Sequence, residues 1–469
     1  MLVEAAVRQT QASTQGTWKV RRESVGSKRA GGWELQREGQ QVRRRRAAAL
    51  RVGTPDATLS AVGGLAAFNA FVEREGVDRE LRRQFGHLKK RRGVVYPMHE
   101  QLRLLIDASV AGAKRVFDFE WLAGDAVFKH LAGGAVPSID VVYDDLRRFG
   151  EKEIAALEAL VAKHGLEALR RKRHRELTVD IDTTVEVLFG EQEGALAGPN
   201  PRYKGRPSYH PILARIAETD TVVGARLRPG NTGFGVDDAA VVEQWLAAVH
   251  RAAPRAIVTV RIDAGGDCAA LMDAIDRSKS HFVIKAKLTS KLRCAISSPK
   301  TKWHTVDRDA FGRPTRQVAE VDFARPGWPS RYRVVAVRTT ERDAGKQVCL
   351  WEGLDYSVHA YITNDTERDL DTLVRLYDGR AGVEPLIAEL KNGFGIGKVS
   401  TSAFDANAAA FLIKLLAYNL LRRWVATDRP HYAAWRAAWI RRACICVPAR
   451  LLRSSGRWYL RLAPRPLLN

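Results

Sequence analysis

A change of hydrophobic period near residue 177 constrains the fold of this 469-residue chain more than any other feature. Upstream of it, apolar residues recur at helical spacing. In LTVDIDTTVEV, residues 177–187, apolar and polar residues alternate, as in a strand with one buried face. From there to residue 288 the patterns predict three strands and then helix, strand, helix, strand. This order predicts a mixed α/β sheet with right-handed crossovers.

Periodicity and composition predict six segments along the chain. We expect a basic flexible arm at 1–58, a helical DNA-binding domain at 59–160, an α/β core in two parts at 176–291 and 362–425, a mostly β insertion at 292–361, and an arginine-rich C-terminal segment at 426–469.

The charge of the chain predicts a polyanionic partner. The formal net charge is +23 and the isoelectric point is about 10.1. An excess of positive charge this large would make the chain repel itself unless a polyanion offsets it, so nucleic acid is the expected partner. Five scattered cysteines and a polar, arginine-rich N-terminus favour a reducing cytoplasm, with no disulfide framework, structural zinc site or signal peptide. The most apolar run, AAAFLIKLLAYNLLRRW, is interrupted by Lys414 and Asn419, so we expect a buried helix and no membrane partner.

Three carboxylates are candidates for phosphoryl-transfer chemistry. Asp182 lies in the first core strand, and Asp263 ends a buried strand just before a glycine pair, where a side chain can emerge at the carboxyl edge of a sheet. Glu384 is offered by a later helix. Such a set could hold two divalent ions, Mg²⁺ or Mn²⁺, one activating a nucleophilic oxygen and one stabilising the leaving oxygen. Asp180 lies on the same strand face as Asp182, so the pattern leaves a choice between them.

The stretch YDGRAGVEPLIAELK, residues 377–391, supplies that glutamate. On a regular helix Tyr377, Arg380, Glu384 and Lys391 fall within a sector of about 60°, beside an apolar stripe. Pro385 predicts a kink or a first-turn position. Glu389 points elsewhere and is expected to be solvated, so that its removal should change little. The alternative is an ordinary amphipathic helix with a mixed-charge face.

DIDTT, VRIDAGG and YDGRAGVEPLIAELK resemble the three acidic motifs of bacterial insertion-sequence DDE transposases with a Tyr-Arg-Glu-Lys signature. The nearest group is the insertion-sequence family numbered thirteen-eighty, to which GRPSYHPILARIAET and LRPGNT are also similar. The resemblance covers residues 59–465. It implies a ribonuclease-H-like mixed-sheet catalytic core interrupted by a β insertion, with a helical N-terminal DNA-binding domain.

The resemblance also implies the chemistry. Asp182, which directly precedes Thr183, would act with Asp263 and Glu384 as catalytic metal ligands. Tyr377, Arg380 and Lys391 would bind phosphate. The expected activity is cut-and-paste transposition through a DNA hairpin, on terminal inverted repeats and target DNA, by a homodimer in the synaptic complex at a bacterial nucleoid. Trp303, Trp328 and Trp351 are candidates to hold an extruded base, although each is more simply a core residue. The rivals are a structure-specific metal-dependent nuclease and a non-catalytic, transposase-derived DNA-binding protein.

Overall fold

The computed structural model describes residues 18–21, 34–37, 40–41, 54–90, 93–171, 173–198, 200, 203–340, 356–399 and 401–464. The chain forms two compact units, Met1–Asp56 and Ala57–Asn469. In the first unit the strands β1 (Trp18–Arg21), β2 (Glu34–Arg37) and β3 (Gln40–Gln41) pair antiparallel in that order. Apart from residues 54–58, the rest of the predicted basic arm lies outside the described residues, and the prediction of its flexibility with it.

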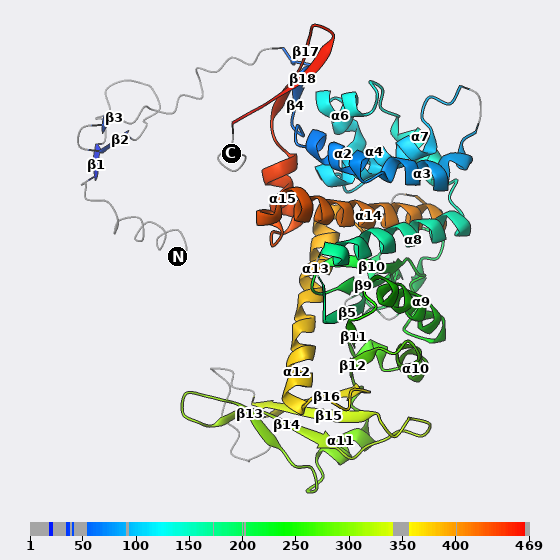
Figure 1. Ribbon diagram of the computed structural model, residues 1–469, viewed down its shortest axis with the longest axis vertical. Coiled ribbons are helices and arrows are strands. Elements are labelled where there is room, and N and C mark those ends of the chain that lie inside the picture. Colours follow the sequence, from blue (N-terminus) through cyan, green and yellow to red (C-terminus); the bar gives the residue numbers. More distant parts are fainter. Residues whose placement is uncertain are drawn as a thin grey trace. The chain divides into compact units, whose positions relative to one another are not determined.

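A nine-stranded sheet is the centre of the second unit (Figure 1). Its order is β10-β9-β5-β11-β12-β16-β15-β14-β13. The strands are β5 (Glu176–Thr183), β9 (Ile212–Ile216), β10 (Thr221–Arg226), β11 (Ile257–Ile262), β12 (His281–Lys285), β13 (His304–Arg308), β14 (Pro314–Val321), β15 (Arg333–Thr340) and β16 (Tyr356–Thr363). Together with the surrounding helices they confirm the expected mixed α/β class.

The predicted alternation decides the two faces of the sheet. β5, β11 and β12 run parallel, and β9 and β10 form an antiparallel hairpin beside β5. Leu177, Val179 and Ile181 join a hydrophobic cluster with helices α9 (Val236–Ala252) and α10 (Ala269–Arg277). Since side chains alternate along a strand, Asp180 and Asp182 face the opposite side.

The strands of the predicted insertion lengthen this same sheet. After α11 (Ser290–Ile296), β13 to β16 form an antiparallel set whose last strand pairs with β12, with Val283 opposite Thr363. The predicted strand at 208–219 is interrupted. β8 (Pro207–Tyr209) pairs with β6 (Glu186–Val187) and β7 (Leu196–Ala197) in a small separate sheet. β9 starts only after Pro211, which has no N–H to donate to a ladder.

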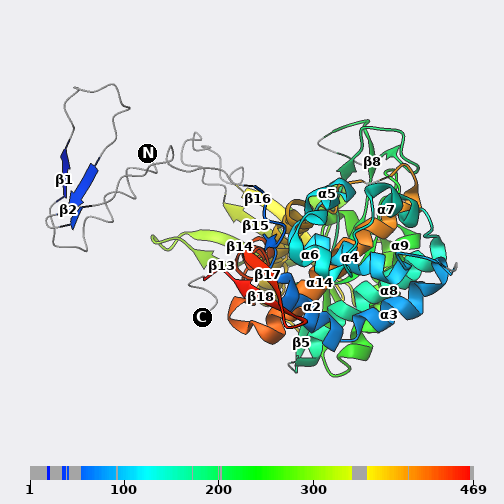
Figure 2. The ribbon, with the colours of Figure 1, turned by 90° about the horizontal axis from the view of Figure 1, so that it is seen from above.

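Helices fill the chain between residues 65 and 166, as the helical period predicts. They are α2 (Leu65–Arg74), α3 (Val77–Phe85), α4 (Met98–Ala111), α5 (Phe119–Ala123), α6 (Ala126–Leu131), α7 (Ile139–Leu146) and α8 (Glu151–Leu166), with 3-10 turns at Gly86–Leu88, Val116–Asp118 and Glu167–Arg171. Ser138 caps α7 as expected, because its side chain accepts a hydrogen bond from the Val141 N–H. These helices share one hydrophobic cluster with α14 (Phe404–Asp428). α14 lies between α2, α4 and α6 and the sheet, whereas α8 lies on the sheet side of α14 and packs against β10 (Figures 1 and 2).

Helix α14 is the buried helix predicted from the apolar run. By length and composition it could cross a membrane, but 83% of its most apolar window is buried inside the protein. The two polar residues that interrupt the run both bond internally. Lys414 Nζ donates to the carbonyls of Gly395 and Lys398, at 2.8 and 3.0 Å. Asn419, with no exposed surface, bonds to the edge strand β10.

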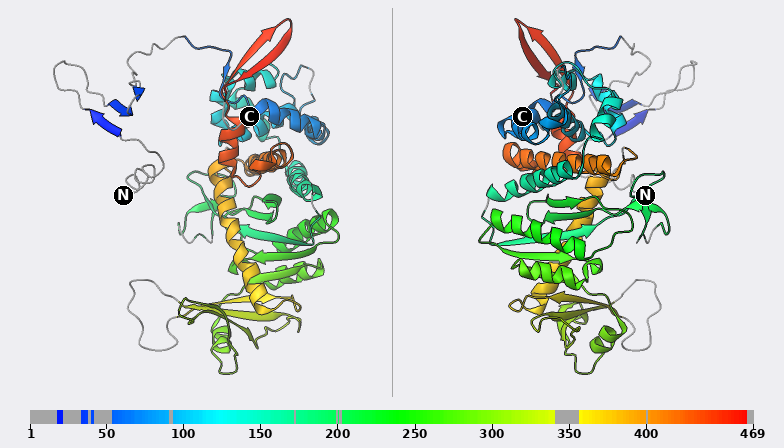
Figure 3. Two further views of the ribbon diagram at one scale, coloured as in Figure 1. Left: turned by 60° about the vertical axis from the view of Figure 1, so that its left-hand side comes forward. Right: turned by 90° about the vertical axis from the view of Figure 1, so that its right-hand side faces the viewer.

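The segment that carries Glu384 is a chain of short helices (Figures 1 and 3). It consists of α12 (Leu370–Asp378), a 3-10 turn (Gly379–Gly382), α13 (Val383–Glu389) and a π-helix (Leu390–Phe394). Pro385 lies in the first turn of α13, as predicted, and the apolar stripe is buried. The single 60° face is wrong, because the 3-10 turn and the π-helix change the angle between successive side chains.

The C-terminal segment closes the second unit. After a 3-10 turn (Pro430–Tyr432) come α15 (Ala437–Ile440), a π-helix (Arg441–Ile445), and the strands β17 (Ala449–Ser454) and β18 (Arg457–Leu462). β17 also pairs with β4 (Leu59–Ser60), so both ends of this unit meet in one small sheet.

The three hydrogen bonds of the Asn419 side chain should stabilise the fold. The side chain accepts from the Val222 N–H at 2.9 Å and donates to the Val222 and Val161 carbonyls at 2.7 and 2.9 Å. Asn419→Ala would remove these three buried hydrogen bonds, so we expect a loss of about 3 kcal/mol in the free energy of unfolding, measured by urea titration. Gln244→Ala, at an exposed position of α9, is the matched control and should change it by less than about 0.5 kcal/mol. Equal losses would show that the Asn419 bonds do not matter.

Candidate active site

Two candidate aspartates meet at the carboxyl ends of neighbouring parallel strands. In the β5–β11 ladder Asp180 is opposite Arg261 and Ile181 is opposite Ile262. One step further along both strands, this register places Asp182 beside Asp263, with neighbouring strands about 4.8 Å apart. Asp263 caps the 3-10 turn Ala264–Gly266, and its Oδ1 accepts from the Gly265 N–H at 2.9 Å. The sheet therefore brings these two carboxylates together.

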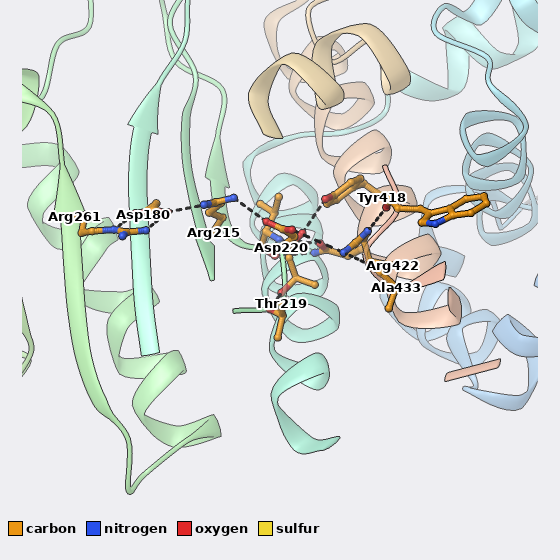
Figure 4. A network of polar contacts seen from close by, with 12 residues as sticks. Asp180, Arg215, Thr219, Asp220, Arg261, Tyr418, Arg422 and Ala433 are labelled. Atoms are coloured by element: carbon orange, nitrogen blue, oxygen red, sulfur yellow. Dashed lines mark hydrogen bonds and ion pairs between the residues drawn. The ribbon is translucent and has the colours of Figure 1, made fainter. Parts of the chain in front are cut away.

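Asp180, the alternative to Asp182, is fully enclosed by arginines. It has no exposed surface. Its carboxylate accepts from Arg261 Nε and Nη2 at 2.6 and 2.9 Å and from Arg215 Nε at 2.9 Å (Figure 4). Both carboxylate oxygens of Asp180 accept from guanidinium groups, so Asp180 pairs with Arg215 and Arg261.

The two arginines that hold Asp180 also support the segment carrying Glu384. Arg261 Nη1 donates to the Leu376 carbonyl in α12 at 2.5 Å. A Cβ atom at Gly379 would lie 2.4 Å from Arg261 Nη1, and one at Gly382 would lie 2.6 Å from Arg215 Nη2. Only glycine permits so close an approach. The turn Gly379–Gly382 therefore rests directly on the Asp180 cluster.

The same cluster extends to the C-terminal segment (Figure 4). Arg215 Nη1 donates to Asp220 at 2.8 Å, and the Tyr418 hydroxyl of α14 donates to the Asp220 carbonyl at 2.8 Å. Arg422, 3.9 Å from the Asp220 carboxylate, donates to the carbonyls of Ala433 and Trp435. A continuous set of polar contacts thus runs from the central strand to residues beyond α14.

Arg380 lies beside the paired aspartates. Its Nη2 is 3.0 Å from Asp182 Oδ1, and the residue is only 9% exposed. Within the part of the chain that the structure describes, neither Nε nor Nη2 makes a hydrogen bond of good geometry. The guanidinium therefore offsets the charge of Asp182 and keeps donors available for an oxyanion.

Negative charge is in excess at this point of the sheet. Burial raises the pKa of Asp182 to about 6, and repulsion from Asp263 and Glu384 adds to the rise, while Arg380 opposes it. Glu384, which is exposed, is therefore within electrostatic range of Asp182. Burial likewise raises the pKa of Tyr377 to about 12, with Asp263 and Asp182 contributing. The Tyr377 ring is stacked on Tyr361, with centroids 4.3 Å apart. These predicted site residues thus form one electrostatic group: Asp182, Asp263, Glu384, Tyr377 and Arg380.

A family model described as transposase DDE domain group 1 matches residues 43–466. The chain belongs to this DDE transposase family. Membership implies an enzyme that cleaves nucleic acid by phosphoryl transfer. No curated protein matches the sequence. Among solved structures, the chain is similar to the cryo-EM structure of piggyBac transposase synaptic complex with hairpin DNA, at 10% identity and a TM-score of 0.40 over 81% of this chain and 78% of that chain. A likeness this low carries no functional argument.

The donor set of this DDE transposase is chemically suited to a hard divalent cation. Asp182, Asp263 and Glu384 supply carboxylate oxygens, the ligands that Mg²⁺ prefers. In the described residues, however, no three His, Cys, Asp or Glu side chains are already arranged to hold a metal ion. Asp182 is paired with Arg380 instead.

Lys391 and Glu389 contact other residues. Lys391, in the π-helix, is 2.8 Å from the Glu186 carboxylate and donates to the Val185 carbonyl at 3.0 Å. Lys391 therefore lies just beyond the end of β5. The expectation that Glu389 is solvated is wrong. Its carboxylate is half-buried and accepts from the Ala437 N–H at the start of α15, and burial raises its pKa.

Sequence reasoning missed His210 and left the tryptophans open. His210 is buried, its Nδ1 donates to the Thr232 carbonyl, and Asp263 is near enough to affect its pKa, which burial lowers. The only feature of the sequence that points to His210 is the His-Pro pair at the start of HPILARIAET. Trp303 and Trp328 each have an arginine over the ring face, Arg338 at 4.4 Å and Arg325 at 4.8 Å. Trp351 lies outside the described residues.

The two neighbouring aspartates should differ sharply in their effect on stability. Asp180→Asn leaves Arg215 and Arg261 buried with a weakened partner, so we expect the free energy of unfolding to fall by about 3–5 kcal/mol. Asp182→Asn, at the edge of the sheet, removes repulsion from Asp263 and Glu384 and should cost much less. Urea titration of both variants measures the difference. A larger loss for Asp182→Asn would refute the assignment of Asp180 as the structural carboxylate.

Glu389 should stabilise the C-terminal segment. Glu389→Ala removes the acceptor of the Ala437 N–H, and we expect the free energy of unfolding to fall by about 1–2 kcal/mol. Glu389→Gln keeps an acceptor oxygen and should lose less. Thermal melting of the two variants beside the parent protein measures this order, and identical melting of all three would contradict it.

Proposed function

We propose that this DDE transposase excises a DNA element at its terminal inverted repeats and joins the freed ends to target DNA, with Asp182, Asp263 and Glu384 as its catalytic acids. The observation that carries the proposal is the β5–β11 register, which sets Asp182 beside Asp263 on the face that the Glu384 segment covers. Excision through a DNA hairpin intermediate, and membership of the insertion-sequence family numbered thirteen-eighty in a bacterial nucleoid, belong to the same proposal.

The strand order supports a ribonuclease-H-like core. β10-β9-β5-β11-β12 comprises an antiparallel hairpin beside three parallel strands, with α9 and α10 as the crossovers. In this arrangement the first strand in sequence, β5, is central and offers its carboxyl end to the reaction. The strands β13 to β16 then follow as the insertion before the Glu384 segment.

The residues divide into ligands and phosphate-binding groups. Asp182, Asp263 and Glu384 would hold Mg²⁺ or Mn²⁺, two ions in the full site, which when bound would activate the attacking oxygen and stabilise the leaving oxygen. Arg380, buried with donors to spare, would bind a non-bridging phosphate oxygen. Tyr377, held by Tyr361, would position the phosphate next to the scissile bond. Lys391 would neutralise phosphate charge at the end of β5, in exchange for its contact with Glu186.

The charge of the protein supports DNA as the partner. A formal charge of +23 favours a polyanion. Helices α2 to α8 would contribute to recognition of the inverted repeats, and two copies of the chain would pair the element ends in the synaptic complex.

Cleavage should depend on a divalent metal and on each acid. Asp182→Asn, Asp263→Asn and Glu384→Gln are each expected to reduce nicking of duplexes carrying the inverted repeats that bound the gene by at least about 10³-fold, while DNA binding persists, since phosphate contacts lie mainly elsewhere. Single-turnover cleavage with Mg²⁺, and again with excess EDTA, measures this. Asp237→Asn, at an exposed position of α9, is the matched control.

Strand transfer distinguishes a transposase from a structure-specific nuclease. Supplied with pre-cut ends bearing a free 3′ hydroxyl, a transposase joins them to plasmid DNA, whereas a nuclease does not. Full cleavage by the Glu384→Gln variant, or metal-independent cleavage by the parent protein, would overturn the proposed site.

A further inference from the structure

A two-stranded ribbon at the C-terminal end of the described chain projects from the helices (Figures 1 and 3). It consists of β17 and β18 and is called here the arginine ribbon. The two-residue turn Ser455–Gly456 joins the strands, with φ of 50° and 77°. Positive φ at both positions is typical of a type I′ turn, whose twist matches that of the flanking strands. The ribbon is therefore a defined hairpin.

The two faces of the arginine ribbon have different surroundings. One face carries Trp458, whose ring lies 4.8 Å from that of His130 in α6 and 5.5 Å from the guanidinium of Arg453. This face holds the ribbon against α6. The cross-strand register puts Arg450, Leu452 and Ser454 on the other face, opposite Arg461, Tyr459 and Arg457 respectively. That second face is the outer face of the ribbon.

The outer face of the ribbon is rich in arginine. Arg450 and Arg461 are directly opposite each other, and Arg457 lies on the same face. Residues 429–469 contain nine arginines and neither Asp nor Glu. Among the described residues, no ion pair involves Arg457 or Arg461, and both are exposed, as is Tyr459 at 49%. Arg457 and Arg461 are therefore accessible to an anionic partner.

We propose that the outer face of the arginine ribbon binds the phosphate backbone of duplex DNA, with Arg457 and Arg461 each contacting a phosphate. This inference rests on the proposed function, since it identifies one surface on which the transposase holds its DNA. A two-stranded antiparallel ribbon fits the major groove of B-DNA, and arginine matches phosphate oxygens in pairs. Phosphate contacts position a protein on DNA without reading its sequence. The ribbon is thus a positioning surface that acts alike on element ends and on target DNA.

The salt dependence of binding tests this directly. Each phosphate contact displaces condensed counterions and contributes about 0.9 to the slope of log K against log salt concentration. For the full-length double variant Arg457→Gln/Arg461→Gln we expect the slope to become shallower by about 1.8. The loss should be equal on a duplex carrying the inverted repeat and on a scrambled duplex. Fluorescence anisotropy over a range of NaCl concentrations measures both.

A double variant with the same net charge provides the control. Arg170 and Arg277 are exposed and each already pairs with an acid, Glu167 and Glu243. Arg170→Gln/Arg277→Gln should leave the slope at the parent value. Thermal melting of both double variants checks that the fold is intact, and single-turnover cleavage by Arg170→Gln/Arg277→Gln should match that of the parent enzyme.

Three results would overturn the proposal. An unchanged slope for Arg457→Gln/Arg461→Gln would show that the ribbon makes no phosphate contact. A loss confined to the inverted-repeat duplex would indicate base reading. If Arg457→Gln/Arg461→Gln had a lower molar mass than the parent protein in DNA-free light scattering, the outer face would bind a second copy of the chain. In each case normal cleavage by the parent enzyme leaves the proposed function standing, whereas a parent enzyme that neither binds nor cuts DNA refutes that function itself.

Discussion

The pairing of one buried carboxylate with two guanidinium groups supports the candidate site. Asp180 is completely enclosed, and Arg215 and Arg261 are almost so. Buried charges are costly to desolvate and are tolerated where hydrogen bonds satisfy them. Asp220 completes the balance, because it gives Arg215 a second acid at 2.8 Å. Two acids and two arginines form a nearly neutral group, and the turn before Glu384 rests on it through Gly379 and Gly382.

Position along one strand separates the structural acid from the catalytic candidate. Asp180 and Asp182 are two residues apart and share a face, so local chemistry is the same for both. Asp180 lies within the ladder, where β9 and β11 each supply an arginine. Asp182 lies where β11 ends, next to Asp263 and below Arg380. Asp182 therefore lies at the candidate site because β11 ends beside it, whereas Asp180 is paired with arginines of both neighbouring strands.

The C-terminal segment is connected to the site at several points. Tyr418 and Arg422 of α14 contact Asp220, and Glu389 accepts from the start of α15 (Figure 4). Beyond α15 the chain reaches the arginine ribbon, which is held by β4 and α6. In the chain, α14 follows the segment that carries Glu384 and precedes the arginine ribbon.

The sequence alone determined the elements and the residue types of the site. Alternation at 177–187 predicted a strand with one polar face, and the apolar run at 408–424 predicted a buried helix. Both are confirmed, because period and burial are local properties. The resemblance to the acidic motifs favoured Asp182, Asp263 and Glu384 as a set. Only the tertiary structure paired Asp180 with Arg215, brought Lys391 to Glu186, and placed Glu389 against Ala437. Each of these outcomes depends on a partner 35 or more residues away in sequence, or on a π-helical turn that shifts every later side chain, and neither is encoded in a local pattern.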